Sequence, residues 1–117
     1  MPFKFEKLTV WQKALELTGS VHDVTKEFPK DELFVLAAQM KRAADSVCLN
    51  IAEGATGLSN TEFSRFLQIA LRSNMEVVCC LFIAQKRNII TAENFTAIYR
   101  KREEVLVMIN GLRKSLQ

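Results

Sequence analysis

Residues 59–87 read SNTEFSRFLQIALRSNMEVVCCLFIAQKR, and this uninterrupted stretch decides the fold class. It opens with Ser59 and Glu62 in the S-x-x-E pattern that caps the start of an α-helix. Apolar side chains then recur at steps of three and four, which places them on one helical face. These are Phe63, Phe66, Leu67, Ala70, Val77, Leu81 and Ala84. Lys86 and Arg87 suit a helix C-terminus, so we predict one long helix here.

The same stretch contains a second apolar series, about a quarter-turn from the first. It consists of Leu71, Met75, Val78 and Phe82. A bundle helix needs only one apolar stripe, so the second either widens the intramolecular core or forms a subunit interface. We expect an interface, because a small bundle has too little interior for all its apolar side chains. Others without an obvious place in the core are Phe3, Phe5, Phe34, Val35 and Leu49.

Three further helices are predicted on either side of this one. Apolar spacing of the same kind marks residues 9–28, 31–53 and 91–115. Pro29 should stop the first helix, and Thr91 is a suitable N-cap for the last. The connections are short, and short connections make long helices run antiparallel. The predicted fold is therefore all-α, an antiparallel up-down-up-down four-helix bundle.

One flexible loop is expected over residues 54–58, which read GATGL. Gly54 follows the second predicted helix directly. Glycine is common just after a helix because it adopts positive φ without strain. We therefore predict a positive φ at Gly54.

The composition fits one modest domain spanning residues 1–117. Four glycines and two prolines are too few for a β-sandwich. Three cysteines are a poor disulfide framework, and reduced thiols suit the cytoplasm, where we expect the protein to be. The longest apolar run, residues 77–84, is far shorter than the roughly 20 residues of a membrane span, so no membrane partner is expected.

Polar residues of the second predicted helix form a line beside its apolar stripe. They are Gln39, Arg42, Ser46, Asn50 and Glu53, named here the polar seam together with Glu76. This line is either a solvated face or a hydrogen-bonded seam against the third helix or a second subunit. In an antiparallel hairpin we expect Arg42 to pair with Glu76, within or between subunits. Glu53 should find Arg65 or a backbone donor.

Basic residues are scattered along the third and fourth predicted helices, and the net charge is +3. The candidate nucleic-acid-binding residues are Arg65, Arg72, Lys86, Arg87, Arg100, Lys101 and Lys114. Phosphate binding needs such cations on one surface, whereas acidic residues lie between these. A ring of subunits would repeat the patch and strengthen its field. Arg102 falls inside an apolar stripe, where we expect an ion pair at the bundle edge.

The residues give little support to an enzyme. His22 is the only histidine, so the paired Glu-x-x-His motifs of di-iron bundles are missing. Zinc-ligand spacing and a glycine-rich phosphate loop are also lacking. We expect no catalysis, no metal, no cofactor and no small-molecule substrate.

Residues 39–54, QMKRAADSVCLNIAEG, resemble the signature of bacterial four-helix-bundle proteins named after 23S rRNA intervening sequences. Ser73 and Glu76 extend the resemblance into the third helix. A relative, the accessory variability determinant of diversity-generating retroelements, forms a pentamer that engages a reverse transcriptase and nucleic acid. The resemblance implies a homo-oligomer, five subunits, and association with ribosomal or other structured RNA or with a nucleic-acid-handling protein. The alternative is a protein-interaction scaffold with no nucleic-acid role.

Overall fold

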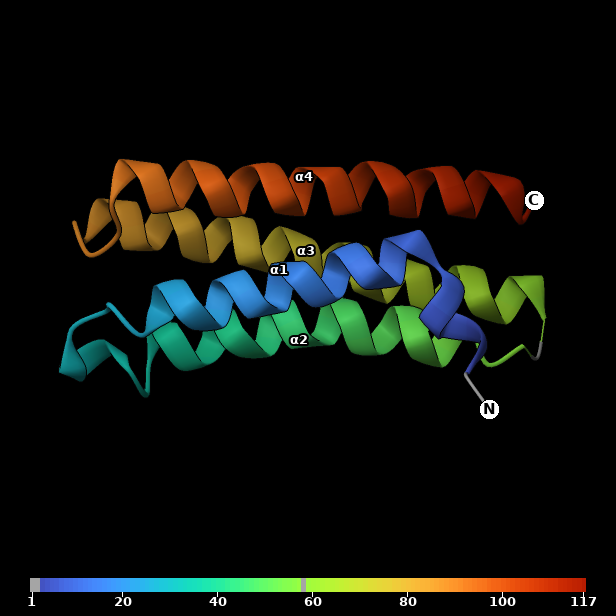
Figure 1. The fold of residues 1–117 in the computed structure, drawn as a ribbon, viewed down its shortest axis with the longest axis horizontal. Helices are drawn as coiled ribbons and strands as arrows, with labels where there is room; N and C mark the ends of the chain where they lie inside the picture. The colour runs from blue at the N-terminus through green and yellow to red at the C-terminus, as the bar shows by residue number, and fades with distance from the viewer. Residues whose placement is uncertain (1–2, 58) are drawn as a thin grey trace.

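Four α-helices make up most of the chain in the computed structural model, which describes residues 3–57 and 59–117 (Figure 1). The helices are α1 (Thr9–Thr25), α2 (Leu36–Gly54), α3 (Asn60–Lys86) and α4 (Ala92–Ser115). Two short 3-10 helices, η1 (Lys4–Lys7) and η2 (Lys30–Glu32), precede α1 and α2. The described residues contain no strand. The all-α prediction is confirmed.

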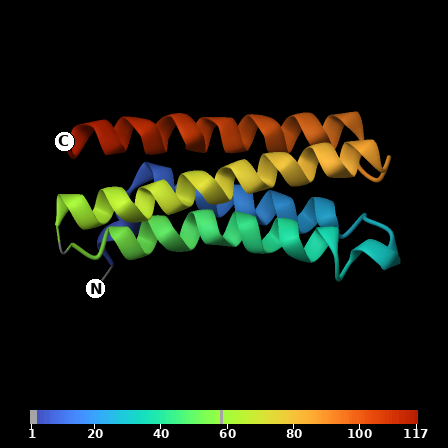
Figure 2. The same ribbon diagram turned by 180° about the vertical axis from the view of Figure 1, so that it is seen from behind.

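The four helices run side by side along the long axis of the molecule and alternate in direction (Figures 1 and 2). Each of α1 and α3 packs against both α2 and α4, whereas no Cα atom of α2 lies within 8 Å of one in α4. The bundle measures 43 × 27 × 20 Å, and its most extensive contact joins α2 to α3. The predicted up-down-up-down bundle is therefore confirmed, with α2 and α4 on one diagonal.

The core is built from the apolar stripes that the spacing predicted. Leu17, Met40, Leu67 and Ile109, one from each helix, are fully buried. Burying each such side chain contributes roughly 1.5–3 kcal/mol relative to leaving it exposed. The stripes therefore account for the association of the four helices.

The two predicted N-caps are formed as expected. The Ser59 hydroxyl accepts a hydrogen bond from the backbone N–H of Glu62 at 3.0 Å. The Thr91 hydroxyl does the same for Asn94, also at 3.0 Å. These bonds satisfy donors that have no partner inside the helix, which is why α3 and α4 begin within one residue of their predicted starts.

The predicted start of the second helix is wrong by five residues. Residues 30–32 form a 3-10 turn, and α2 begins only at Leu36. Val35, at φ −117° and ψ −93°, separates the two. Arg87 holds the Glu32 carboxylate at 3.0 and 2.8 Å, so a tertiary contact supports this turn. The first helix likewise ends at Thr25, three residues early.

Gly54 does not have the positive φ that its sequence position suggested. It is the last residue of α2, and the left-handed glycine is Gly57, at φ +93°. A Cβ on Gly54 would lie 2.8 Å from side-chain atoms of both Phe63 and Phe66. This glycine therefore permits the close approach of α2 to α3. Leu58, in the predicted loop, lies outside the described residues.

By length and apolar composition alone, α3 is the one described helix that could cross a membrane. In the bundle it packs against α2 and α4 instead. Its two apolar series explain the high hydropathy, since only one of them is needed for the core. The arrangement is consistent with a soluble protein.

Candidate functional site

The second apolar series of α3 lies along its boundary with α4 and is only partly covered. We call Leu71, Met75, Val78 and Phe82 the α3 ridge. Met75 is 54% exposed and Phe82 52% exposed, while Leu71 and Val78 are half-buried. The single chain thus leaves an apolar strip on its surface, which is the property expected of an interface. Coverage by a second subunit remains a prediction.

Aromatic rings continue the ridge onto α4. Phe82 meets Phe95 edge-on, with ring centroids 5.5 Å apart. Phe95 in turn stacks on Tyr99 at 6.0 Å. The ridge is therefore a joint surface of α3 and α4, held in place by packed rings.

Arg102 does not form the ion pair that we expected. It is only 4% exposed, and its Nε donates to Asn74 Oδ1 at 3.0 Å. Asn74 Nδ2 donates in return to the backbone carbonyl of Arg102 at 2.9 Å. The guanidinium carbon lies 4.9 Å from the ring centroid of Tyr99, within cation–π range. A fully buried amide therefore occupies the place where we expected an acid.

Sequence reasoning missed Asn74, although a signal was present. Asn74 lies seven residues after Leu67 and seven before Leu81. Seven residues are nearly two helical turns, so these three side chains share a face. An asparagine between two core leucines indicates a buried hydrogen-bonding partner elsewhere. Arg102, a charged residue inside the apolar stripe of α4, was the corresponding signal in the other helix.

The polar seam is hydrogen-bonded to α3 at its centre, where Ser46 meets Ser73. The hydroxyls of Ser46 and Ser73 lie 2.8 Å apart. Asn50 Nδ2 donates to the carbonyl and the hydroxyl of Ser46, at 2.8 and 3.0 Å. Gln39, at the start of the seam, is exposed. The seam therefore joins α2 to α3 through Ser46 alone, which Asn50 supports from the next turn of α2, and it leaves its ends in solvent.

The two predicted ion pairs are not formed within the chain. Among residues 3–57 and 59–117, Arg42 and Glu76 have no ion-pair partner. Arg65 binds Glu62, three residues earlier on its own helix, and so leaves Glu53 free. Glu62 is already adjacent to Arg65 on the same helix face, so this ion pair forms without bringing together side chains from two helices. An Arg42–Glu76 pair between subunits stays a prediction.

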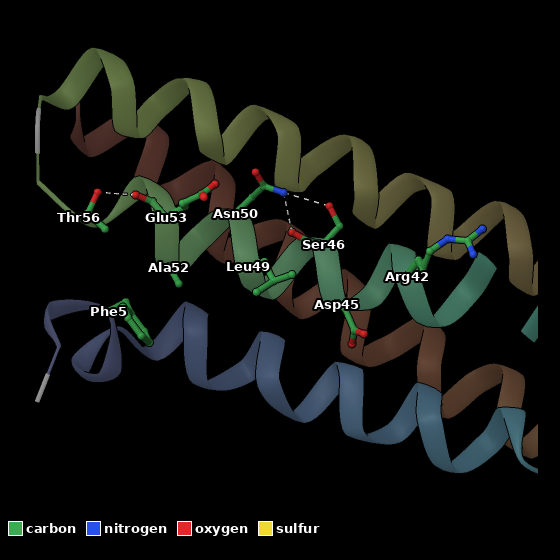
Figure 3. A pocket seen from close by; sticks show the side chains of 9 residues that line it. All are labelled: Phe5, Arg42, Asp45, Ser46, Leu49, Asn50, Ala52, Glu53 and Thr56. Carbon is green, nitrogen blue, oxygen red and sulfur yellow. Dashed lines mark hydrogen bonds between the residues drawn. The ribbon is translucent and has the colours of Figure 1, made fainter. Parts of the chain in front are cut away.

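A groove of about 730 Å³ runs along the outer face of α2 (Figure 3). We call it the α2 groove. Its lining residues are Phe5, Arg42, Asp45, Ser46, Leu49, Asn50, Ala52, Glu53 and Thr56. It thus combines the outer half of the polar seam with an apolar wall, of which Leu49 is 66% exposed.

Neighbouring elements position two of the groove's side chains. Phe5, which we expected to lack an intramolecular site, reaches the groove through η1 and packs edge-on against Trp11 at 4.8 Å. Asp45 points toward α1, where it accepts a hydrogen bond from Thr18 and lies 3.2 Å from His22 Nε2. One lining carboxylate is therefore already engaged, and Glu53 is the other.

The seven candidate phosphate-binding cations do not form one cluster. Arg87 is bound by Glu32 and Arg65 by Glu62, and Lys101 lies beside Glu104 on the α1 side. Lys101 and the remaining four cations have no ion-pair partner among the described residues. The four are spread over the length of α3 and α4, and they are Arg72, Lys86, Arg100 and Lys114. One subunit therefore offers dispersed positive charge and no concentrated patch.

The thiols have the properties of structural residues. Burial raises the pKa of Cys48 and of Cys80 to about 11, with smaller contributions from the charges of Asp45 and Glu76 respectively. Both thiols are therefore protonated at neutral pH, and a thiol is a much weaker nucleophile than a thiolate. The described residues contain no group of three metal-ligating side chains.

Comparison with known proteins gives a family and a similar solved structure. A family model described as 23S rRNA-intervening sequence protein matches residues 6–111. A crystal structure of a protein with unknown function, from the S23 ribosomal protein family of Bacteroides thetaiotaomicron VPI-5482, superposes with a TM-score of 0.84. The two chains are 25% identical, and the match covers 91% of this chain and 99% of that one. None of the curated proteins matches this sequence.

Proposed function

The chain belongs to the 23S rRNA-intervening sequence protein family, whose model matches residues 6–111, and on this premise we propose that it is a non-catalytic binding module that works as a homo-oligomer. The observation that carries the proposal is the exposed α3 ridge. Its four side chains are already about half covered within the chain, so covering the rest would contribute at most roughly 3–6 kcal/mol, before the cost of association. The exposed side chains outside the ridge would have to add to this. Five subunits is the number that the family resemblance suggests.

The ligand class that we propose for the assembly is structured RNA, ribosomal or other. The family name, the net charge of +3 and the five candidate cations without ion pairs among the described residues support it. These cations are too dispersed on one subunit to bind phosphates strongly. In a closed assembly each recurs once per subunit, and the combined field attracts a polyanion far better than one copy does. RNA binding should therefore depend on assembly.

The alternative function is a protein-interaction scaffold without a nucleic-acid role. The ion pairs of Arg65 and Arg87 favour it, because a cation held by a carboxylate is less available to phosphate. The protonated state of the two buried thiols, Cys48 and Cys80, supports a non-catalytic role for them in either case.

Light scattering on three proteins tests the assembly. The wild type should run well above 13.3 kDa at micromolar concentration, and Val78→Glu/Phe82→Glu should run as a monomer. Val107→Glu is the matched control, because Val107 is 65% exposed on α4 but lies outside the ridge, and this variant should assemble normally. A monomeric wild type would overturn the proposal.

Binding to a structured RNA at increasing salt separates the two ligand classes. If the assembly binds RNA, affinity should fall steeply with salt, since each phosphate contact releases counterions. The ridge variant should bind much more weakly than the wild type. An assembled wild type that shows no salt-dependent RNA binding would favour the scaffold.

A further inference from the structure

The outer face of α2 carries two exposed charges of opposite sign. Of the four charged residues of α2, Arg42 and Glu53 are the two that are exposed. Neither has an ion-pair partner within residues 3–57 and 59–117. They are eleven positions apart, which is close to three helical turns and about 16 Å, so they lie on one face of the helix. Both line the α2 groove, toward its opposite ends (Figure 3).

The space between these two charges is mainly apolar. Asp45, the third charged residue of the groove, points toward α1 and is engaged there. The exposed side chain between Arg42 and Glu53 is Leu49, of which 66% is in solvent. Ser46, on the same line, is already hydrogen-bonded to α3. Along α2 the face is therefore positive, apolar and negative in turn.

This order of charges is complementary to itself when a second α2 runs antiparallel to the first. Arg42 and Glu53 lie equally far, in opposite directions, from the point between Val47 and Cys48. A two-fold axis through that point, perpendicular to the helix, exchanges the two positions. Each Arg42 then comes opposite the Glu53 of the other copy, and the two Leu49 side chains come together near the axis.

We propose that the outer face of α2 is a two-fold contact between copies of this chain, in which each Arg42 pairs with the Glu53 of the other copy. Such a contact is isologous, because both copies use the same patch. It covers Leu49 on both sides, and the α2 groove of about 730 Å³ beside each leucine receives the other one. A parallel arrangement in register is disfavoured, because it places like charges together. RNA fits less well, because Glu53 repels phosphate.

The α2 contact is separate from the α3 ridge, which lies along α3 and α4. Exposed ion pairs contribute little to stability, so two lone subunits associate only weakly through α2. A ridge variant is therefore still monomeric at micromolar concentration. Between two ridge assemblies several α2 contacts form at once, and their joint strength far exceeds that of one. In this last step, which rests on the proposed self-association, the α2 face joins assemblies that the ridge builds.

Charge reversal in the Val78→Glu/Phe82→Glu background tests the α2 contact without the ridge. Sedimentation equilibrium at several hundred micromolar measures the weak self-association of this background protein. Adding Arg42→Glu or Glu53→Arg places like charges opposite each other, and each should weaken self-association about tenfold. Mixed in equal amounts, these two variants should form a one-to-one dimer at least as tightly as the background protein associates, because both pairs are then attractive.

Glu76→Arg in the same background is the matched control. Glu76 is an exposed carboxylate of α3 without an ion-pair partner among the described residues, and the sequence suggested it as the partner of Arg42. This variant should self-associate like the background protein. Circular dichroism checks that every variant keeps the helical content of the background protein.

The outcomes separate this inference from the proposed function. A mixture of the Arg42→Glu and Glu53→Arg variants that stays monomeric overturns the α2 contact. Self-association that is weakened by Glu76→Arg and unchanged by Glu53→Arg assigns Arg42 to Glu76 and also overturns it. A wild type that is monomeric at micromolar concentration overturns the ridge assembly, whereas pairing of the two reversed variants would still establish the α2 contact.

Discussion

The two sides of α3 are packed in different ways. On the α2 side the helices approach closely at Gly54, and the small hydroxyls of Ser46 and Ser73 bond directly across the boundary. On the α4 side large rings and a long guanidinium fill the space, with Phe82 and Tyr99 among them. Small residues bring the first pair into its extensive contact, and large ones leave the ridge partly in solvent.

This difference shows how one helix can stabilise a hairpin and still present a surface. Close packing of small side chains leaves few atoms exposed, so the side of α3 that faces α2 is already packed within the subunit. Large side chains on the α4 side pack against one another and still leave Met75 and Phe82 about half exposed. The α4 side is therefore where a second molecule has most to bury.

The largest expected effect concerns the buried amide on the α4 side. Asn74→Ala should destabilise the fold by roughly 3 kcal/mol or more, since it leaves the buried Arg102 without its hydrogen-bond partner. Denaturant unfolding measures the loss. The double variant Asn74→Leu/Arg102→Met should recover much of the stability, because replacing both partners with apolar groups removes the unsatisfied donor. A double variant less stable than Asn74→Ala would contradict this explanation.

A smaller change in stability is expected when glycine is replaced by alanine in two helices. Its sign should differ between them, because only Gly54 lies where α2 approaches α3 closely. Gly54→Ala should lower stability by ~1–3 kcal/mol, because its Cβ would lie 2.8 Å from Phe63 and Phe66 atoms. Gly19→Ala in α1 meets nothing within 4 Å and should raise stability by about 0.5–1 kcal/mol. Thermal melts of the two variants measure both changes. Equal shifts would mean that the α2–α3 approach is looser than described.

The smallest effect is expected at the hydroxyl pair. Ser46→Ala removes a bond to Ser73 and one from Asn50, and should cost about 1 kcal/mol. Ser20→Ala in α1, whose hydroxyl makes no hydrogen bond among the described residues, is the control and should change the melting temperature little. If the two variants melt alike, the seam does not stabilise the hairpin.

The sequence by itself determined the helices, because the information is local. The capping hydroxyls of Ser59 and Thr91 act within three residues, and the apolar period is read over a few turns. The second apolar series of α3 was also visible, and its partial exposure agrees with that reading. Family membership followed from residues 39–54, which form most of α2 and most of the groove.

Only the tertiary structure decided which polar groups meet. The bond of Arg102 to Asn74 joins residues 28 positions apart. The sequence led us to expect an acidic partner for Arg102, because it does not show which residue of α3 faces it. From its position after a predicted helix, Gly54 was expected to have a positive φ. In the bundle its missing side chain instead leaves room for Phe63 and Phe66. The α2 groove also depends on η1, which places Phe5 in the same lining as Leu49. No periodic pattern in the sequence predicts that these two residues lie together. Helix formation depends on neighbours in the chain, whereas these contacts depend on how the finished helices are placed.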